Sequence, residues 1–214
     1  MNIAGILIFL LSTVQTECGN LTWQPAQTRL VADLFRYYDS RVRPTFRVNI
    51  TTNVTIRAEL YLLVEVNEPK QALTVSMWMT EMWQDQLLFW DPEEYEGIKY
   101  ILVPHNTIWK PDTYLFNSLV VQEDVFRSLY TVRLETNLTT RVTNINLKYP
   151  VLYTFWCELE VLFFPFDTQN CTLIFGSWTS DSKSLTYQPD SENVSTHNFV
   201  ENTGWKLLSF VAKR

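Results

Sequence analysis

Apolar and polar residues alternate along residues 54–66, a pattern typical of an antiparallel strand that is buried on one face. A polar turn at residues 67–70 leads to a second alternating segment, and together they predict a β-hairpin. The apolar face of the first strand comprises Val54, Ile56, Ala58, Leu60, Leu62, Val64 and Val66. The apolar face of the second strand comprises Leu73, Val75, Met77 and Met79.

Residues 25–37 follow a different period, which predicts one short amphipathic helix. Its apolar positions are Leu30, Val31, Leu34 and Phe35. The rest of the chain returns to alternation, with polar turns between the segments. Further strands are predicted at residues 119–134, 141–147, 151–161, 171–178 and 205–212. Many short strands and a single helix predict an all-β sandwich.

Two tryptophans break the alternation, because each lies on the face of its strand opposite the apolar one. Trp78 shares a face with small polar residues such as Ser76, and Trp178 lies opposite Leu173 and Phe175. A large ring on such a face predicts contact with a ligand or with a neighbouring chain. The alternative is a ring that only caps the edge of the sandwich.

The length and composition of the chain predict a single domain. Its 214 residues, 46% of them hydrophobic, can bury one sizeable core. The net charge of -6 comes from scattered acids, and the chain has no basic run to follow a phosphate backbone, so nucleic acid is not an expected partner. The acidic surface is compatible with attracting a cationic small molecule or simply with solubility.

Two independent signals predict an extracytoplasmic location. An apolar run at residues 3–11 predicts a signal peptide over residues 1–17; it has no Lys or Arg before it, and a buried terminal segment is the alternative. No later stretch approaches the ~18 apolar residues of a membrane-spanning helix. The second signal is a set of six N-glycosylation sequons, at Asn20, Asn49, Asn53, Asn137, Asn170 and Asn193.

The chain has three cysteines, so in an oxidising compartment one is left over unless it pairs with another chain. Cys18 lies beside the predicted cleavage point, which leaves Cys157 and Cys171 as the natural pair. On the chain-entropy account, closing the loop between them would stabilise the fold by about 3 kcal/mol.

The sequence does not favour an enzyme. His105 and His197 are the only histidines, both in predicted loops, and there is no nucleophile motif or metal-ligand spacing. Glu158 and Glu160 share one strand face, as solvent-facing acids commonly do. We expect no catalytic residues, no metal and no cofactor.

The segment between the later cysteines carries the most specific motif, C-E-L-E-V-L-F-F-P-F-D-T-Q-N-C. Its cysteine spacing, with Phe164, Pro165, Phe166 and Asp167 between, resembles the signature of the Cys-loop family of pentameric neurotransmitter-gated ion channels. An apolar hairpin tip suits burial against another surface. In that family the tip rests on the transmembrane domain and carries movement from the binding site to the pore. A tip folded back onto its own sandwich is the alternative.

The resemblance extends over most of the chain. The intervals between Trp78, Trp83 and Trp90 are similar to those of acetylcholine-receptor-like subunits, residues 109–112 resemble the family's W-x-P-D motif, and residues 176–179 resemble the segment with the binding-site tryptophan. The implied fold is the immunoglobulin-like β-sandwich of the family's ligand-binding domain, with one N-terminal helix.

The resemblance also implies roles for individual residues. Phe116 and Trp178 would bind the ligand from one subunit and Trp78 from its neighbour. Aromatic faces bind a desolvated ammonium with on the order of 1 to 2 kcal/mol per good contact. Because Phe116 stands where the family often has a tyrosine, the resemblance favours an amine without specifying acetylcholine. Glu68, in the first hairpin turn, matches an acid that pairs in the family with an arginine just before the membrane.

Residues 204–207 resemble the strand that enters the family's capping loop, and the sequence ends at Arg214. We therefore expect a ligand-binding domain over residues 18–214 that stops before the capping loop, the last strand and the transmembrane helices. The expected partners are a neurotransmitter-like ligand, homologous subunits of a homo- or hetero-pentamer, and the membrane through the missing transmembrane domain. The expected location is the extracellular face of the plasma membrane, or the medium if the protein ends at Arg214.

The expected function is to sense a small amine at subunit interfaces and to couple its binding to a pore. Three alternatives remain open from the sequence. They are a secreted soluble binding protein of the same fold, a truncated non-conducting subunit, and an adhesion-type β-sandwich.

Overall fold

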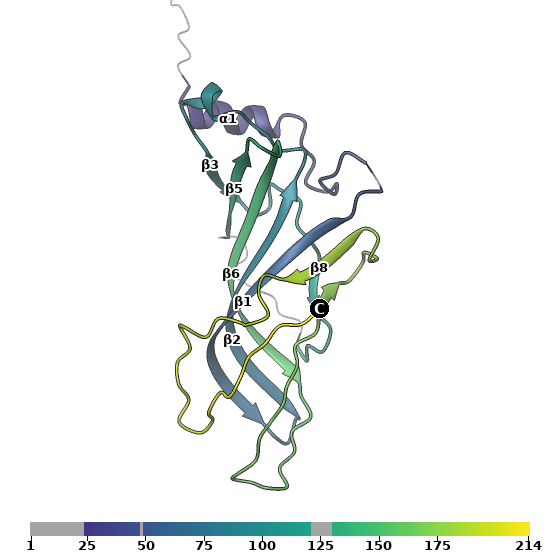
Figure 1. The fold of residues 1–214 in the computed structure, drawn as a ribbon, viewed down its shortest axis with the longest axis vertical. Coiled ribbons are helices and arrows are strands. Elements are labelled where there is room, and N and C mark those ends of the chain that lie inside the picture. Colours follow the sequence, from purple (N-terminus) through teal and green to yellow (C-terminus); the bar gives the residue numbers. More distant parts are fainter. Residues whose placement is uncertain (1–23, 48, 121–129) are drawn as a thin grey trace, which may run out of the picture.

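The described part of the fold is all-β with one short α-helix at its apex, as the sequence predicts, and a single 3-10 turn, η1, at Pro92–Tyr95 (Figure 1). The computed structural model describes residues 24–47, 49–120 and 130–214. The predicted signal peptide, Cys18 and Asn20 lie outside the described residues.

Within the described residues, eight strands form a large sheet and a small one. In the six-stranded sheet the order is β3-β5-β6-β2-β1-β8, and only the β1–β8 pair is parallel. The small sheet pairs β4 with β7. The bounds are β1 Thr52–Asn67, β2 Ala72–Asp85, β3 Tyr100–Pro104, β4 Thr113–Leu115, β5 Thr131–Asn137, β6 Val142–Trp156, β7 Phe175–Ser177 and β8 Leu185–Pro189.

The predicted helix is confirmed as α1, Ala26–Phe35, with Pro25 at its N-cap position. Proline suits the start of a helix because the first N–H groups have no partner within the helix. Leu30 is fully buried, and Val31, Leu34 and Phe35 pack against the same core. The amphipathic face predicted from the helical spacing is therefore the face that is buried.

The predicted β1–β2 hairpin forms, but β1 does not keep one apolar face along its whole length. The register shifts between Leu60 and Leu62 and again between Leu63 and Glu65. Each such irregularity moves the following side chains to the other face. Leu63 consequently packs on the core, whereas Val64 is 47% exposed. The prediction of a buried Val64 was wrong for this reason.

Strand β6 is continuous where the sequence predicted two strands, at residues 141–147 and 151–161. Pro150 lies within it, opposite Trp78 of β2. The carbonyl of Pro150 accepts from Tyr130 Oη, on the side where pairing with β5 has already ended at Leu147. In a strand, the backbone nitrogen and carbonyl of one residue point to the same side. The N–H that Pro150 lacks would therefore face the side on which β6 no longer has a partner strand, so no hydrogen bond between strands is lost.

The C-terminal third is less regular than its alternation predicted. Only residues 175–177 of the predicted strand at 171–178 are extended and paired, and the predicted strand at 205–212 is reduced to a bridge between Asn193 and Val211. Leu207 and Phe210 both pack on the core. A regular strand would place two residues that are three positions apart on opposite faces, so this segment cannot be one. Part of the predicted strand at 119–134 lies outside the described residues. The short strands β3, β4 and β8 were not predicted.

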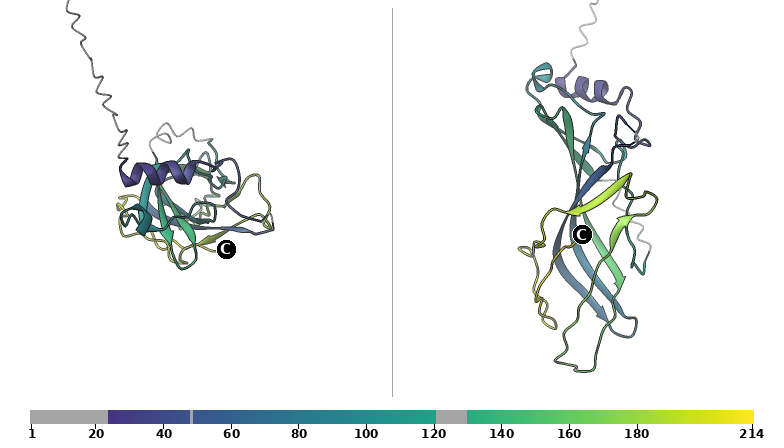
Figure 2. Two further views of the ribbon diagram at one scale, coloured as in Figure 1. Left: turned by 90° about the horizontal axis from the view of Figure 1, so that it is seen from above. Right: turned by 45° about the vertical axis from the view of Figure 1, so that its right-hand side comes forward.

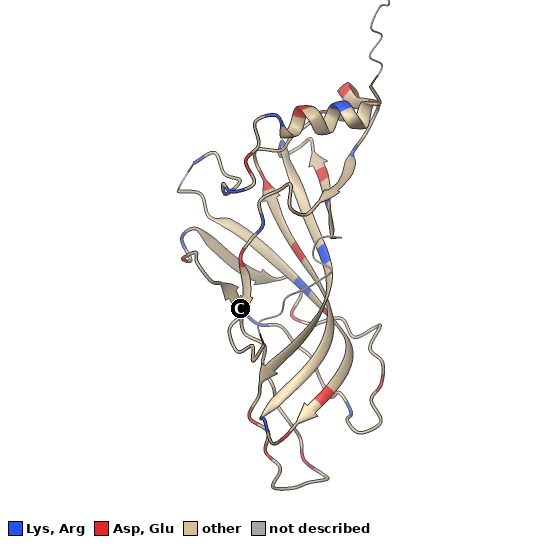
Figure 3. Cartoon of the chain, turned by 180° about the vertical axis from the view of Figure 1, so that it is seen from behind, with Lys and Arg blue, Asp and Glu red and all other residues tan. Residues whose placement is uncertain are grey.

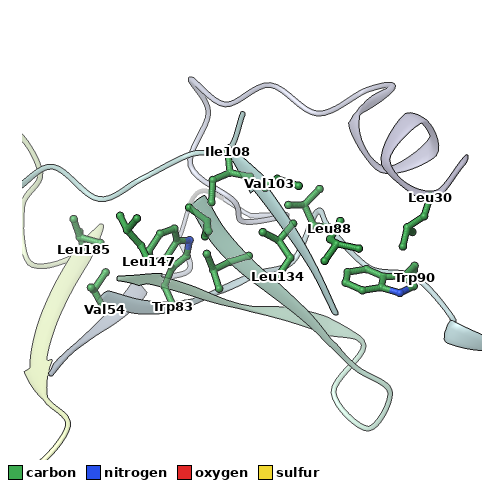
Figure 4. Packing of buried hydrophobic residues seen from close by; sticks show 13 residues of the cluster. Leu30, Val54, Trp83, Leu88, Trp90, Val103, Ile108, Leu134, Leu147 and Leu185 are labelled. Carbon is green, nitrogen blue, oxygen red and sulfur yellow. The ribbon is translucent and has the colours of Figure 1, made fainter. Parts of the chain in front are cut away.

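Two hydrophobic clusters stabilise the sandwich. The cluster below α1 includes Leu30, Trp83, Leu88 and Trp90 (Figure 4). The second includes Met77 of the large sheet and Leu115 of the small sheet, so it joins the two sheets. Burial of aliphatic side chains contributes about 1.5–3 kcal/mol each, which makes these clusters the main source of stability.

The molecule is elongated, with α1 at one end and the green loop closed by Cys157 and Cys171 at the other (Figure 2). Charged residues are spread over most elements and form no continuous basic stripe in the view of Figure 3. The large-scale arrangement therefore separates an apical helix from an apolar loop at the opposite end.

Candidate ligand site and coupling loop

Three aromatic rings meet where β4 pairs with β7, and we call Tyr114, Phe116 and Trp178 the ring cluster. The ring centroids of Tyr114 and Trp178 are 4.9 Å apart, those of Phe116 and Trp178 6.1 Å, and those of Tyr114 and Phe116 5.9 Å. Phe116 is 49% and Trp178 66% exposed. The predicted pair Phe116 and Trp178 thus forms an open aromatic surface.

Tyr114 was missed by the sequence analysis. It lies two residues before Phe116, so both side chains point from the same face of β4, while Leu115 between them is buried. The alternation at residues 114–116 could have identified it. Its hydroxyl gives the ring cluster a polar group that Phe116 lacks.

Asp112 holds the segment around Trp178, the residue that directly follows β7. One carboxylate oxygen accepts from Ser177 Oγ at 2.5 Å; the other accepts from the backbone N–H and the Oγ1 of Thr179, each at 2.6 Å. Partial burial raises the pKa of Asp112, but the hydrogen bonds from Ser177 and Thr179 outweigh it and leave the pKa below its usual value. Trp178 is therefore held between two side chains that donate to one ionised group.

Trp78 belongs to the large sheet, where it is 41% exposed on the face predicted for it. Its ring stacks on Tyr61 of β1, with centroids 5.2 Å apart and planes 14° apart. The structure does not bring Trp78 together with Phe116 and Trp178, which come from the small sheet. Tyr61, the partner of Trp78, was also missed; it faces away from the apolar positions of β1, as Trp78 does in β2.

The predicted disulfide is present and joins Cys157 to Cys171, with their Cα atoms 5.3 Å apart. The tip of the loop between them is apolar and open, with Phe164 68% and Phe166 89% exposed. The Phe164–Pro165 peptide is cis. The tip does not fold back onto its own sandwich, so the alternative considered for it is wrong.

Two glutamines hold the base of this loop. The Gln169 side chain donates to the Glu160 carbonyl and accepts from the Glu160 N–H, and it also donates to Asp167. Gln71, at the end of the β1–β2 turn, accepts from the Leu159 N–H, and its amide nitrogen donates to the Glu68 carbonyl at 2.9 Å.

The Gln71 carbonyl also accepts from the Cys157 N–H at 2.9 Å. Glu68 and the loop between Cys157 and Cys171, predicted separately, are thus joined through Gln71. Gln71 was not predicted, because it lies outside the motif at residues 157–171 and no other sequence signal identifies it.

The predicted glycosylation sites are accessible to different extents. Asn49, Asn53, Asn170 and Asn193 are exposed. Asn137 is half-buried at the β5–β6 turn, where its side-chain oxygen accepts from the N–H groups of Thr139 and Thr140. Exposure is compatible with glycan addition, and the occupancy of these sites stays a prediction.

The described ranges contain no group of three or more His, Cys, Asp or Glu side chains arranged to hold a metal ion. Within the same ranges, no helix has both the length and the apolar character needed to cross a membrane.

Comparison with known proteins identifies the family of the chain. Residues 27–214 match the family described as "Neurotransmitter-gated ion-channel ligand binding domain". The chain is 42% identical over 205 residues to the acetylcholine receptor subunit alpha-type des-2 of Caenorhabditis elegans, covering 96% of this chain and 37% of that protein.

Two further relatives extend the comparison. The chain is 36% identical over 193 residues to the betaine receptor acr-23 of the same organism, covering 89% of this chain and 35% of that protein. It is 33% identical over 215 residues to the human neuronal acetylcholine receptor subunit alpha-10, covering 100% of this chain and 45% of that protein. The chain spans less than half the length of these relatives.

The all-β fold and the disulfide-closed loop agree with a receptor-type ligand-binding domain. The chain belongs to the neurotransmitter-gated ion-channel ligand-binding domain family. This confirms the resemblance that the motif predicted, and members of the family are receptors and not enzymes.

Proposed function

We propose that this chain senses a small amine at interfaces between neighbouring subunits and couples its binding to a pore. The ring cluster would contribute one side of the site, and Trp78 of the next subunit the other. The protein would act on the extracellular side of the membrane, as a subunit of a pentamer.

The observation that carries the proposal is the ring cluster. The rings of Phe116 and Trp178 are exposed and Tyr114 packs beside them, and the ionised Asp112 accepts hydrogen bonds from Ser177 and Thr179 on either side of Trp178. Aromatic faces attract organic cations, with roughly 0.5–2 kcal/mol per contact depending on desolvation. A cationic ligand therefore suits this surface better than an anionic one.

The interface location is supported by the exposure of both sets of rings. Trp78 and Tyr61 form a second open aromatic surface on a different sheet of the same chain. Exposed large aromatic side chains are typical of the centres of protein interfaces. In a pentamer, the ring cluster of one subunit would lie opposite the Trp78–Tyr61 pair of the next subunit.

The coupling role is supported by the loop between Cys157 and Cys171. Its apolar tip, with Phe164, Pro165 and Phe166 exposed, suits a surface that is covered by another apolar surface. The Gln71 contacts join this loop to the β1–β2 turn that carries Glu68. A movement of the loop would therefore displace the β1–β2 turn, and a movement of the turn would displace the loop.

A chimera provides the test. This chain would replace the matching part of the betaine receptor acr-23, and currents would be recorded with betaine and acetylcholine as probes. Trp178→Ala and Trp78→Ala should each raise the half-maximal concentration by about tenfold, the loss of one good cation–aromatic contact. Trp156→Ala is the matched control, because Trp156 is 51% exposed and lies outside both aromatic surfaces. Unchanged sensitivity in both variants would contradict the proposal.

A further inference from the structure

Glu81 of β2 is a buried acid that the proposed function does not use. It is 3% exposed, and its two carboxylate oxygens accept from different strands. Tyr149 Oη of β6 donates to Oε1, and Thr113 Oγ1 of β4 donates to Oε2 at 2.8 Å. Glu81 thus links the large sheet to the first residue of the small sheet.

The direction of these hydrogen bonds can be assigned. A hydroxyl has one proton, and Thr113 donates its proton to Glu81. The contact of 3.1 Å between Thr113 Oγ1 and Tyr187 Oη must then be donated by Tyr187 of β8. Burial first, and the nearby Glu81 carboxylate second, raise the pKa of Tyr149 well above its usual value, so its hydroxyl also stays a donor.

Thr113 is the point at which this network reaches the ring cluster. Tyr114 follows it directly, and Phe116 lies two residues further on. Asp112, the residue before Thr113, accepts hydrogen bonds from Ser177 and Thr179 and so joins this segment to β7. Glu81 binds Thr113 from the large sheet, so Thr113 and the residue just before β4 are held by two separate sets of hydrogen bonds.

We propose that Glu81 is a positioning residue for the ring cluster, which holds β4 at the depth and angle where Tyr114 and Phe116 meet Trp178. The effect on ligand affinity rests on the proposed function, whereas the effect on β4 itself does not. A buried polar network is costly unless all its members are paired, and here it acts together with the burial of Leu115 to specify one placement of a three-residue strand.

The test is amide hydrogen exchange on the full chain without ligand, in the variants Thr113→Val, Thr113→Ser and Glu81→Gln. The reporters are the N–H groups of Phe116 and Trp178, which donate to Ile174 and Asp112 across the small sheet. Valine keeps the shape of threonine without the hydroxyl, and serine keeps the hydroxyl. Thr74→Val is the matched control, since the Thr74 hydroxyl pairs with Thr154 at 3.0 Å within the large sheet.

Thr113→Val should speed exchange at the two reporters by about tenfold, as expected for a buried donor and acceptor left unpaired, while exchange along β2 and β6 is unchanged. Glu81→Gln should act in the same direction, and Thr113→Ser should restore slow exchange. Equal exchange in Thr113→Val and wild type would overturn the inference, and so would an equal increase at the reporters in Thr74→Val. Because no ligand is involved, neither result depends on the response of the chimera, which alone decides the proposed function.

Discussion

The Phe116 ring lies directly over Gly176: a Cβ atom added to Gly176 would be 2.7 Å from Phe116 Cε2. Such a contact is too short, so the Gly176→Ala variant must displace the ring. We expect a clear loss of sensitivity in the chimera with only a small loss of folding stability, because Phe116 is half exposed and can swing toward solvent. Dose–response curves and thermal unfolding would measure the two effects.

Gly204→Ala is the matched control for this prediction, since a Cβ atom there would meet only the Asn202 side chain, at 3.4 Å. Wild-type sensitivity in Gly176→Ala would show that the position of the Phe116 ring is unimportant for the response.

The hydrogen bonds to Asp112 predict a pH dependence of stability. Because they hold its pKa below the ordinary value of 3.8, the ionised carboxylate stabilises the folded state above that pH. This contribution is lost as pH falls below 3.8 through the folded-state pKa. The difference in unfolding free energy between wild type and Asp112→Asn should therefore be constant from pH 7 to 5 and shrink in stronger acid.

Ser177→Ala removes one of the donors to Asp112 and should weaken that pH dependence. Urea unfolding curves recorded at each pH supply the free energies. A difference between wild type and Asp112→Asn that is the same at pH 3 and pH 7 would rule out this role for the carboxylate.

Gln71 should matter for coupling more than for ligand binding. Its backbone has a φ of 51°, a conformation that asparagine tolerates, but the shorter asparagine amide does not reach Leu159. Gln71→Asn should reduce the maximal current per surface-expressed chimera. Arg141→Asn is the control, because Arg141 has a φ of 54° in the β5–β6 turn. A maximal current equal to that of the control variant would speak against the role of Gln71.

The exposed tip of the loop between Cys157 and Cys171 should be dispensable for folding. Phe166 is 89% exposed, so Phe166→Ser should change the unfolding free energy of the isolated chain by less than about 0.5 kcal/mol. The same substitution in the chimera should strongly reduce the current, because the tip would lose its apolar contact. Leu208→Ser, at a side chain that is 70% exposed, is the control. A normal current in Phe166→Ser would contradict the coupling role of the tip.

The sequence predicted the parts of the fold that depend on long, regular patterns. The helix at residues 26–35 and the β1–β2 hairpin follow from periodicity alone, and the disulfide follows from the cysteine count and the position of Cys18 beside the predicted cleavage point. Strand β4 is only three residues long, and the side chains of Asp112 and Glu81, which hydrogen-bond to Ser177 of β7 and to Thr113 of β4, lie outside it. A local pattern has no information about such partners.

The candidate site was predictable to a similar degree. Trp78 and Trp178 were identified because large rings on a polar face break the alternation, and both are exposed. Their ring partners Tyr61 and Tyr114 were missed. Alternation could have identified them, because each lies on the face of its strand opposite the buried apolar residues. Gln71 makes its contacts through a turn and a distant loop, so only the three-dimensional structure could identify it.

In the proposed function, the ring cluster of one subunit and Trp78 of the next form a single ligand site. Co-expression of the Trp78→Ala and Trp178→Ala chimeras tests it most directly, with betaine and acetylcholine as probes. In a mixed ring, a Trp78→Ala subunit still has Trp178, and a Trp178→Ala neighbour still has Trp78, so some interfaces have both rings. We predict that the mixture responds at lower ligand concentrations than either variant alone. A mixture no more sensitive than the better of the two variants would contradict a site shared between subunits.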